Sequence, residues 1–360
     1  MAFRNKIMKQ LAIAGLALAT SLTSGLAAAE DTVGFVYVSP IGDAGWTYQH
    51  DLGRLQMEKE TGVNTKYVEN VAEGADAERV IREMAKRGDK VIFATSFGYM
   101  NYMLKVSKKF PETAFVHATG YKMGKNMGLY NARFYEARYL TGVIAGEMTK
   151  SNILGYAAAF PIPEVLQGIN AFIKGARSVN PKAELRVIWV NSWYDPGKER
   201  QAATTLMSQG ADVITHHTDS TAVVQAAEEQ GKYAFGYHSD MSKYGPKAHL
   251  TATTHHWGDY YTRVVKAVQA GTWKPDNVWG GYKEGMISLA PLNPAIPADL
   301  QARIKKMEKQ MADGSLHAFS GPVVDQDGKV RVAAGATMSD GDLSGMDYYV
   351  EGVVSKLPKK

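Results

Sequence analysis

Short apolar runs rich in β-branched residues alternate along the chain with stretches whose apolar positions recur every three or four residues. The stretches with the longer period predict helices, among them 75–87 and 198–209. Steady alternation of strand and helix is typical of parallel sheets covered by helices, and right-handed crossovers leave few topologies open. The short runs predict strands at 33–39, 64–69, 90–95, 114–119, 127–132, 153–158, 184–190, 212–217, 233–238 and 250–254.

One helix–strand unit occurs twice in the chain. A helix that begins with Glu-Arg and ends at glycine precedes a strand at 78–95, and the same order recurs at 199–217. Chance similarity between two αβ units is the alternative to a true repeat. A true repeat predicts two similar Rossmann-like lobes, each with a parallel sheet, of about 110 residues each. The first lobe is expected at 30–138 and about 258–298, and the second at 139–257 and about 299–356.

The C-terminal part has a different pattern. Residues 299–313 predict an amphipathic helix, with Leu300, Ile304, Met307 and Met311 on one side. Residues 318–332 predict a hairpin around an Asp-Gln-Asp-Gly turn. We expect this helix and hairpin to pack on the lobes.

The first 29 residues predict a signal peptide. Arg4, Lys6 and Lys9 precede an apolar run from Leu11 to about Leu22, and the segment ends in three alanines. The apolar run is shorter than the roughly 20 residues that a membrane-spanning helix needs, although an uncleaved anchor remains the alternative. Cleavage after Ala29 would give an exported protein, which we expect in the periplasm.

Composition narrows the chemistry. The chain has no cysteine, which excludes disulfides, thiol catalysis and thiolate metal sites. Removing the leader lowers the formal charge from +5 to about +2, and no basic block stands out except Lys359-Lys360, so a nucleic-acid partner is not expected. We find no Gly-x-Ser-x-Gly, no Walker phosphate loop and no His-Glu-x-x-His. The sequence therefore predicts a binding protein without a cofactor rather than an enzyme.

Aromatic and hydrogen-bonding residues follow one predicted strand after another. In open α/β sheets, ligands bind beyond the carboxyl ends of the strands, so two facing lobes would bring these residues into one cleft. Rings there can hold a flat ligand, and polar groups can bind its edge. The segments concerned are 39–46, 96–98, 160–163, 191–195, 217–219, 238–240 and 255–257.

Several of these residues also have a purely structural interpretation. Trp46 can pack on its own lobe at the start of a helix, and Asp43 can cap that helix. Trp193 stands beside Tyr194-Asp195-Pro196, a poor setting for a core residue, and this favours exposure to the cleft. Asn170 is either a solvated helix residue or a polar group in the cleft.

Histidines are concentrated between 216 and 256. A zinc site needs three or four ligands in a tetrahedral arrangement. His216-His217 and His255-His256 are neighbours, however, and neighbours on a strand point to opposite faces, so at most one of each pair can join His238 in the cleft. Neutral imidazoles that bind an uncharged ligand fit better, and no metal is expected.

These residues resemble the basic membrane protein family, the substrate-binding proteins of certain ABC importers related to purine nucleoside receptors. The resemblance covers nearly all of the chain after the leader and implies a type I periplasmic-binding fold, a purine held between aromatic rings and a permease partner. Its most specific part is the Tyr-Leu-x-Gly-x-x-Ala-Gly stretch. The matching segments are 33–39, 42–47, 139–146, 162–163, 175–176, 192–196 and 209–214.

The resemblance also implies roles for single residues. Asp43 matches the family's base-binding Asp, Trp46 replaces its stacking Phe, and Trp193 falls where a second aromatic closes on the base. Nucleoside-binding members carry Asp and Lys, which bind ribose, where this chain has His238 and His255. We therefore expect a free purine nucleobase, adenine first, with a nucleoside or sugar receptor as the alternative and a zinc receptor behind it. The expected ligand-binding residues are Asp43, Trp46, Phe97, Asn170, Trp193, His217, His238, Asp240 and Trp257.

Overall fold

The computed structural model describes residues 32–358. It contains two six-stranded sheets, and we call the part built around the first of them the first lobe. The strand order is β11-β5-β4-β3-β1-β2, and every neighbouring pair is parallel. The order in which successive strands are added reverses between β1 and β3, and ligands bind at such a point in parallel sheets. The strands are β1 (Thr32–Val36), β2 (Asn64–Val68), β3 (Val91–Ala94), β4 (Ala114–Ala118), β5 (Met127–Ala132) and β11 (Asn277–Gly280).

The second lobe repeats this plan. Its sheet has the order β12-β10-β9-β8-β6-β7, which matches the first sheet strand for strand, although β12 pairs antiparallel with β10. Two similar α/β lobes are thus confirmed. The strands are β6 (Ile153–Ala158), β7 (Glu184–Trp189), β8 (Val213–His217), β9 (Tyr233–His238), β10 (His249–His255) and β12 (Ile287–Leu289).

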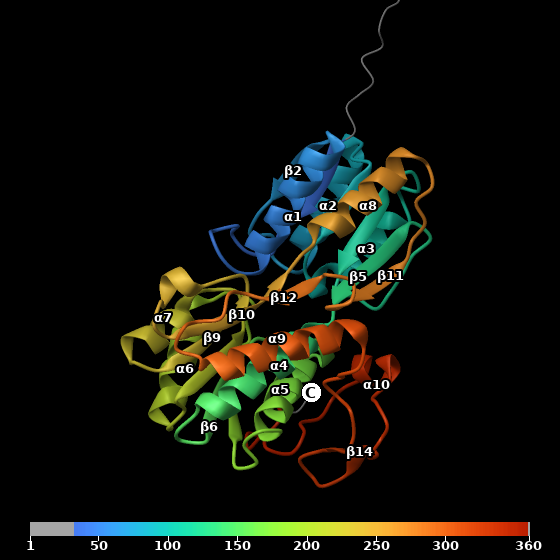
Figure 1. Ribbon diagram of the computed structural model, residues 1–360. Coiled ribbons are helices and arrows are strands. Elements are labelled where there is room, and N and C mark those ends of the chain that lie inside the picture. The colour runs from blue at the N-terminus through green and yellow to red at the C-terminus, as the bar shows by residue number, and fades with distance from the viewer. Residues whose placement is uncertain (1–31, 359–360) are drawn as a thin grey trace, which may run out of the picture. The chain divides into compact units, whose positions relative to one another are not determined.

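Helices cover both sheets (Figure 1). The first lobe carries α1 (Trp46–Thr61), α2 (Ala75–Arg87), α3 (Met100–Ser107) and α8 (Gly258–Gln269), the last of which packs on α1 although it follows β10 in the chain. The second lobe carries α4 (Phe134–Met148), α5 (Pro163–Arg177), α6 (Pro196–Ser208), α7 (Ala222–Glu229), α9 (Ala298–Asp313) and α10 (Asp340–Ser344).

The amphipathic pattern explains these helices. In α2, the apolar Ala77, Val80, Ile81 and Met84 are buried against the sheet, while arginine and glutamate face solvent. The expected helix 75–87 is therefore confirmed, and the expected strands agree with the structure to within a few residues at each end. The sequence pattern missed β11 and β12, which are short.

The most specific sequence motif turns out to be a packing motif. Gly142 of α4 lies so close to α5 that a Cβ atom would stand 2.0 Å from the carbonyl oxygen of Phe172, and one on Gly175 of α5 would stand 2.1 Å from that of Tyr139. Only glycine allows the two backbones to approach this closely. The Tyr-Leu-x-Gly stretch therefore fixes the core of the second lobe.

The chain crosses between the sheets three times, after β5, after β10 and between β11 and β12. Residues 258–298, expected in the first lobe, contribute α8 and β11 to the first lobe and β12 to the second sheet. We call these three connections the hinge.

The C-terminal segment lies against the second lobe. Helix α9 packs on α4, with Leu300, Ile304 and Met311 buried in the same core as α5. Strands β13 (Val323–Val324) and β14 (Val330–Val332) form the expected hairpin. The expected leader, residues 1–29, lies outside the described residues. No helix within 32–358 combines the length and the apolar character needed to cross a bilayer.

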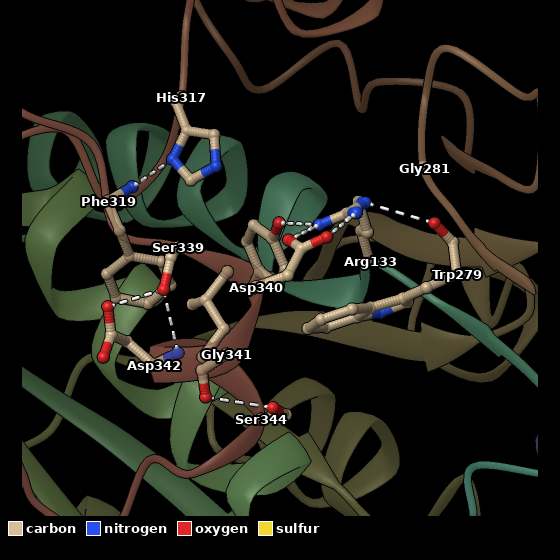
Figure 2. A network of polar contacts seen from close by, with 12 residues as sticks. Arg133, Trp279, Gly281, His317, Phe319, Ser339, Asp340, Gly341, Asp342 and Ser344 are labelled. Atoms are coloured by element: carbon tan, nitrogen blue, oxygen red, sulfur yellow. Dashed lines mark hydrogen bonds and ion pairs between the residues drawn. The ribbon is translucent and has the colours of Figure 1, made fainter. Parts of the chain in front are cut away.

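An arginine at the first crossing ties this segment to the hinge. The guanidinium of Arg133, between β5 and α4, donates to both carboxylate oxygens of Asp340 in α10 at 2.6 and 2.7 Å, and its Nε donates to the carbonyl oxygen of Trp279 at 3.2 Å (Figure 2). The same guanidinium lies 4.5 Å from the centre of the Trp279 ring. A bidentate ion pair, with two hydrogen bonds from one guanidinium to one carboxylate, has a well-defined geometry.

Candidate functional site

A pocket lies between the carboxyl ends of the two sheets, and the free space of about 320 Å³ there includes open solvent. Its walls come from both lobes, and among the described residues that line it none is lysine or arginine. The lining residues are Val38, Trp46, Ser96, Phe97 and Thr119 from the first lobe and Glu164, Trp193, His217, Asp219 and His238 from the second.

Trp46 is the indole of the first-lobe wall. It is the first residue of α1, and its Nε1 donates a 2.6 Å hydrogen bond to the carbonyl oxygen of Thr95, just after β3. The ring packs edge-on against His50 and Trp257 and also against His238 and His255 at the ends of β9 and β10, and it is only 7% exposed. Its hydrogen bond is therefore made within the first lobe, while its ring contacts come from both lobes.

The second indole is held differently. Trp193 follows β7 and packs edge-on against Phe160, with ring centres 5.0 Å apart. Its Nε1 donates a 3.2 Å hydrogen bond to Oε1 of Glu73, which belongs to the loop before α2 in the first lobe. The same Glu73 oxygen accepts from Ser96 Oγ at 2.5 Å and from the Gly98 backbone N–H at 2.9 Å. Trp193 is thus anchored across the cleft.

Two carboxyl groups of the second lobe face the pocket. Burial raises the pKa of Glu164, in the first turn of α5, to about 8, and its carboxyl accepts from the Asn131 amide at 3.2 Å. Burial, together with Glu199 and Glu73, raises the pKa of Asp219 well above its usual range. Both side chains are therefore neutral acids over a wide range of pH.

Two histidines complete this wall. His217 Nε2 lies 3.6 Å from Glu164 Oε1, and His238 Nε2 lies 3.2 Å from Asp219 Oδ1. Burial lowers the pKa of both imidazoles well below the usual value, with Arg138 adding to the effect on His217 and His255 to that on His238. The pocket therefore presents neutral hydrogen-bonding groups between two indoles.

The lobes meet closely beside the pocket. The backbone N–H of Gly45 donates to Ser239 Oγ at 2.7 Å. A Cβ atom on Gly45 would lie 2.2 Å from the carbonyl oxygen of Asp219, and Gly45 has a φ of +99°. Because no side chain fits there, glycine permits the lobes to approach at this point.

The structure brings five of the expected ligand-binding residues to the pocket, namely Trp46, Phe97, Trp193, His217 and His238. Of the pair His216-His217, the second lines the pocket, while His216 is buried and contacts Thr218.

The other four expected residues lie elsewhere. Asp43 is exposed, and its carboxylate accepts from Lys243 and Tyr244 of the second lobe, so it joins the lobes outside the pocket. Asp240 borders the same outer groove. Asn170 is fully buried, because its amide binds the backbone of Tyr348 and Val350. Trp257 stacks on His50 behind Trp46, with ring centres 4.9 Å apart.

The expected set omitted Glu164 and Asp219. A signal for each was present, because Glu164 directly follows Ile162-Pro163 after β6, and Asp219 follows the end of β8 by two residues. Ser96 and Thr119 follow β3 and β4 in the same way. Within residues 32–358, no group of three His, Asp or Glu side chains is arranged to hold a metal ion.

Comparison with known proteins bears directly on this pocket. Residues 30–316 match the family Bmp, described as ABC transporter substrate-binding protein PnrA-like. The chain belongs to this family of substrate-binding proteins. The Bmp match covers both sheets and every pocket residue and ends before the hairpin β13–β14.

Three known proteins are similar to this Bmp protein. It is 52% identical over 94% of its length to a purine-binding protein of Brucella abortus (strain 2308), of which the match covers 97%. It is 38% identical over 90% of its length to a Haloferax volcanii protein provisionally named an ABC transporter glucose-binding protein, with 80% of that protein covered. An ABC transporter solute-binding protein from Aeropyrum pernix K1 has the same fold, with a TM-score of 0.70, 18% identity and coverage of 82% and 95% of the two chains. Bmp proteins are extracytoplasmic receptors rather than enzymes, which agrees with the class expected from the sequence.

Proposed function

We propose that this protein is the periplasmic receptor of an ABC importer and binds a purine nucleobase, adenine first, in the pocket between the lobes. Family membership supports the importer, and the name of the Brucella relative supports a purine. The observation that carries the proposal is the pair of indoles, Trp46 and Trp193, which come from different lobes and line one small pocket.

The chemistry of the pocket favours an uncharged, flat ligand. Aromatic rings stack on a heterocycle, and each such contact contributes about 0.5–1.5 kcal/mol beyond the burial of area. Stacking alone therefore does not give tight binding, so hydrogen bonds from His217, His238, Asp219 and Glu164 to the edge of the base must supply the rest. A phosphorylated ligand would lack a cationic partner among the described lining residues.

The residues at the site favour a base over a nucleoside. The resemblance places the ribose-binding Asp and Lys of nucleoside receptors where this chain has His238 and His255, and both of these imidazoles are buried. Closure then buries the base and presents the surfaces of both lobes to a permease.

Calorimetry of the purified mature chain with adenine, guanine, adenosine and glucose tests this proposal. We expect adenine to bind with the highest affinity and glucose not to bind. Tightest binding of adenosine would place a nucleoside in the pocket, and binding of glucose alone would assign the protein to sugars, as the name of the Haloferax relative suggests for that protein. Mass spectrometry of the molecule released on denaturation is an independent measurement of the same ligand.

A further inference from the structure

We propose that Asp219 is a specificity-determining residue whose buried carboxyl binds an edge on which an N–H donor stands beside a ring-nitrogen acceptor. The 6-amino group of adenine and its neighbouring ring nitrogen form such an edge. This inference rests on the proposed function, since it requires a purine in the pocket.

The position of Asp219 is fixed by its backbone. It lies in the loop between β8 and α7, lines the pocket and is 5% exposed. Its backbone N–H donates to the carbonyl oxygen of Trp193 at 2.9 Å, which links it to one of the two indoles. Its own carbonyl oxygen faces Gly45 of the first lobe. Asp219 therefore stands where the two walls of the pocket meet.

One oxygen of the Asp219 carboxyl has no protein partner. Oδ1 lies 3.2 Å from His238 Nε2, although that nitrogen makes no hydrogen bond among the described residues, and Oδ2 is buried and likewise has no hydrogen-bond partner there. A buried polar atom without a partner costs about 1–3 kcal/mol. A ligand that bonds to this oxygen would recover that free energy on binding.

The surroundings oppose a charge on this carboxyl. Glu73 faces it from the loop before α2 and Glu199 faces it from α6. Glu199 is itself buried and accepts from Thr218 and from Ser220. Two neighbouring acids and burial all favour the protonated form.

The partner imidazole is also unsuited to carry a charge. His238 is buried, and His255, His217, Arg138 and His216 all disfavour its protonation. The guanidinium of Arg138 is engaged elsewhere, since it donates to Thr215 Oγ1 and to the carbonyl oxygen of His216. Both ring nitrogens of His238 are buried without a hydrogen-bond partner among the described residues, so a neutral His238 places no opposite charge beside Asp219.

A neutral carboxyl has one donor and one acceptor side by side. Its O–H can donate to a ring nitrogen while its C=O accepts from an adjacent amino group, giving two hydrogen bonds to one edge. An ionised carboxylate offers acceptors only and would lose the bond to the ring nitrogen. The carboxyl therefore distinguishes adenine from unsubstituted purine, which lacks the amino group.

The test compares adenine and unsubstituted purine by calorimetry in wild type, Asp219→Asn and Asp219→Leu. An asparagine amide keeps one donor and one acceptor, so Asp219→Asn should retain the preference for adenine over purine, about tenfold for one hydrogen bond. Asp219→Leu has neither group and should bind the two ligands alike. Asp219→Ala, which needs less space, replaces the leucine variant if that variant melts early.

The matched control is Asp76→Asn, which removes an exposed carboxylate of α2 that pairs only with Arg79 and should leave both affinities unchanged. Equal preference for adenine in wild type and Asp219→Leu, or loss of that preference in Asp219→Asn, would overturn the role of Asp219. A wild type that binds neither purine would instead overturn the proposed function.

Discussion

The two lobes share a strand order but contribute opposite kinds of surface to the pocket. The first lobe supplies Trp46, Phe97 and small hydroxyl groups, and its indole is bonded to backbone within the same lobe. The second lobe supplies both acids and both histidines in addition to Trp193. The two similar lobes thus have different parts in the pocket. The first lobe supplies an aromatic platform, Trp46 and Phe97, and the second supplies most of the polar groups that we expect to bind the ligand edge.

The anchoring of the indoles follows the same division. Trp46 keeps its hydrogen bond in any arrangement of the lobes, whereas Trp193 depends on Glu73 of the first lobe. We infer that the open protein presents an ordered first lobe and a less constrained Trp193. The ligand would therefore dock first on the first lobe, and the second lobe would close over it.

The largest effect is expected where the lobes touch. Gly45→Ala places a Cβ 2.2 Å from the carbonyl oxygen of Asp219 and should prevent full closure. We expect adenine affinity to fall about 100-fold, the equivalent of about 2.7 kcal/mol, measured by calorimetry. Gly42→Ala is the control, because Gly42 also has a positive φ but nothing lies within 4 Å of its Cβ position. Equal losses in both variants would attribute the effect to backbone strain instead of closure.

The platform itself is the next target. Trp46→Ala should weaken adenine binding at least about tenfold, since it removes a stacking ring and leaves a cavity beside the ligand. Trp273→Ala, outside the pocket in the first lobe, controls for loss of an indole as such. Unchanged affinity in Trp46→Ala, measured by calorimetry, would remove Trp46 from the site.

Glu73→Gln tests the anchor of Trp193. A neutral amide is a weaker acceptor for the three donors that meet at this oxygen, so affinity should fall about threefold to tenfold. Stopped-flow fluorescence should show the change mainly in the dissociation rate, because closure follows docking. Glu83→Gln, on the exposed face of α2, is the matched control. A change confined to the association rate would contradict the order of docking and closure.

The smallest effect concerns stability without ligand. Glu164 holds its proton up to a pKa of about 8 in the folded chain, whereas the unfolded chain releases it near 4.5. The folded state therefore binds more protons between these values, and stability should decline as pH rises from about 4.5 to about 8. Thermal melting of Glu164→Gln should show a shallower decline, by a few degrees at the alkaline end. Parallel melting curves would mean that Glu164 ionises normally.

Periodicity was sufficient to predict most of the fold. It identified the strands of both sheets up to β10. The central strands are apolar runs buried on both faces, whereas the edge strands β2 and β7 are partly exposed and mix polar with apolar residues. Strand β11 is only four residues long and follows a proline by two positions, so it has too little pattern to be recognised. Strand β12 has three residues and gains its place only by pairing with β10.

The site was predictable only where a residue's position in the sheet decides its role. His217 is the last residue of β8 and Trp193 lies in the loop after β7, and both reach the pocket. The surroundings of Asn170 and Asp43 are set by partners that are far away in sequence. Asn170 binds a backbone segment 178 residues later, and Asp43 pairs with Lys243. No local pattern contains such partners.

The ion pair of Arg133 and Asp340 connects the C-terminal segment to the hinge. Arg133 occupies the first crossing and also holds Trp279 just before the third, so the pair fastens the tail to two of the three connections on which the lobes turn. Any change in the angle between the lobes therefore has to keep or break a two-bonded ion pair that lies outside the pocket.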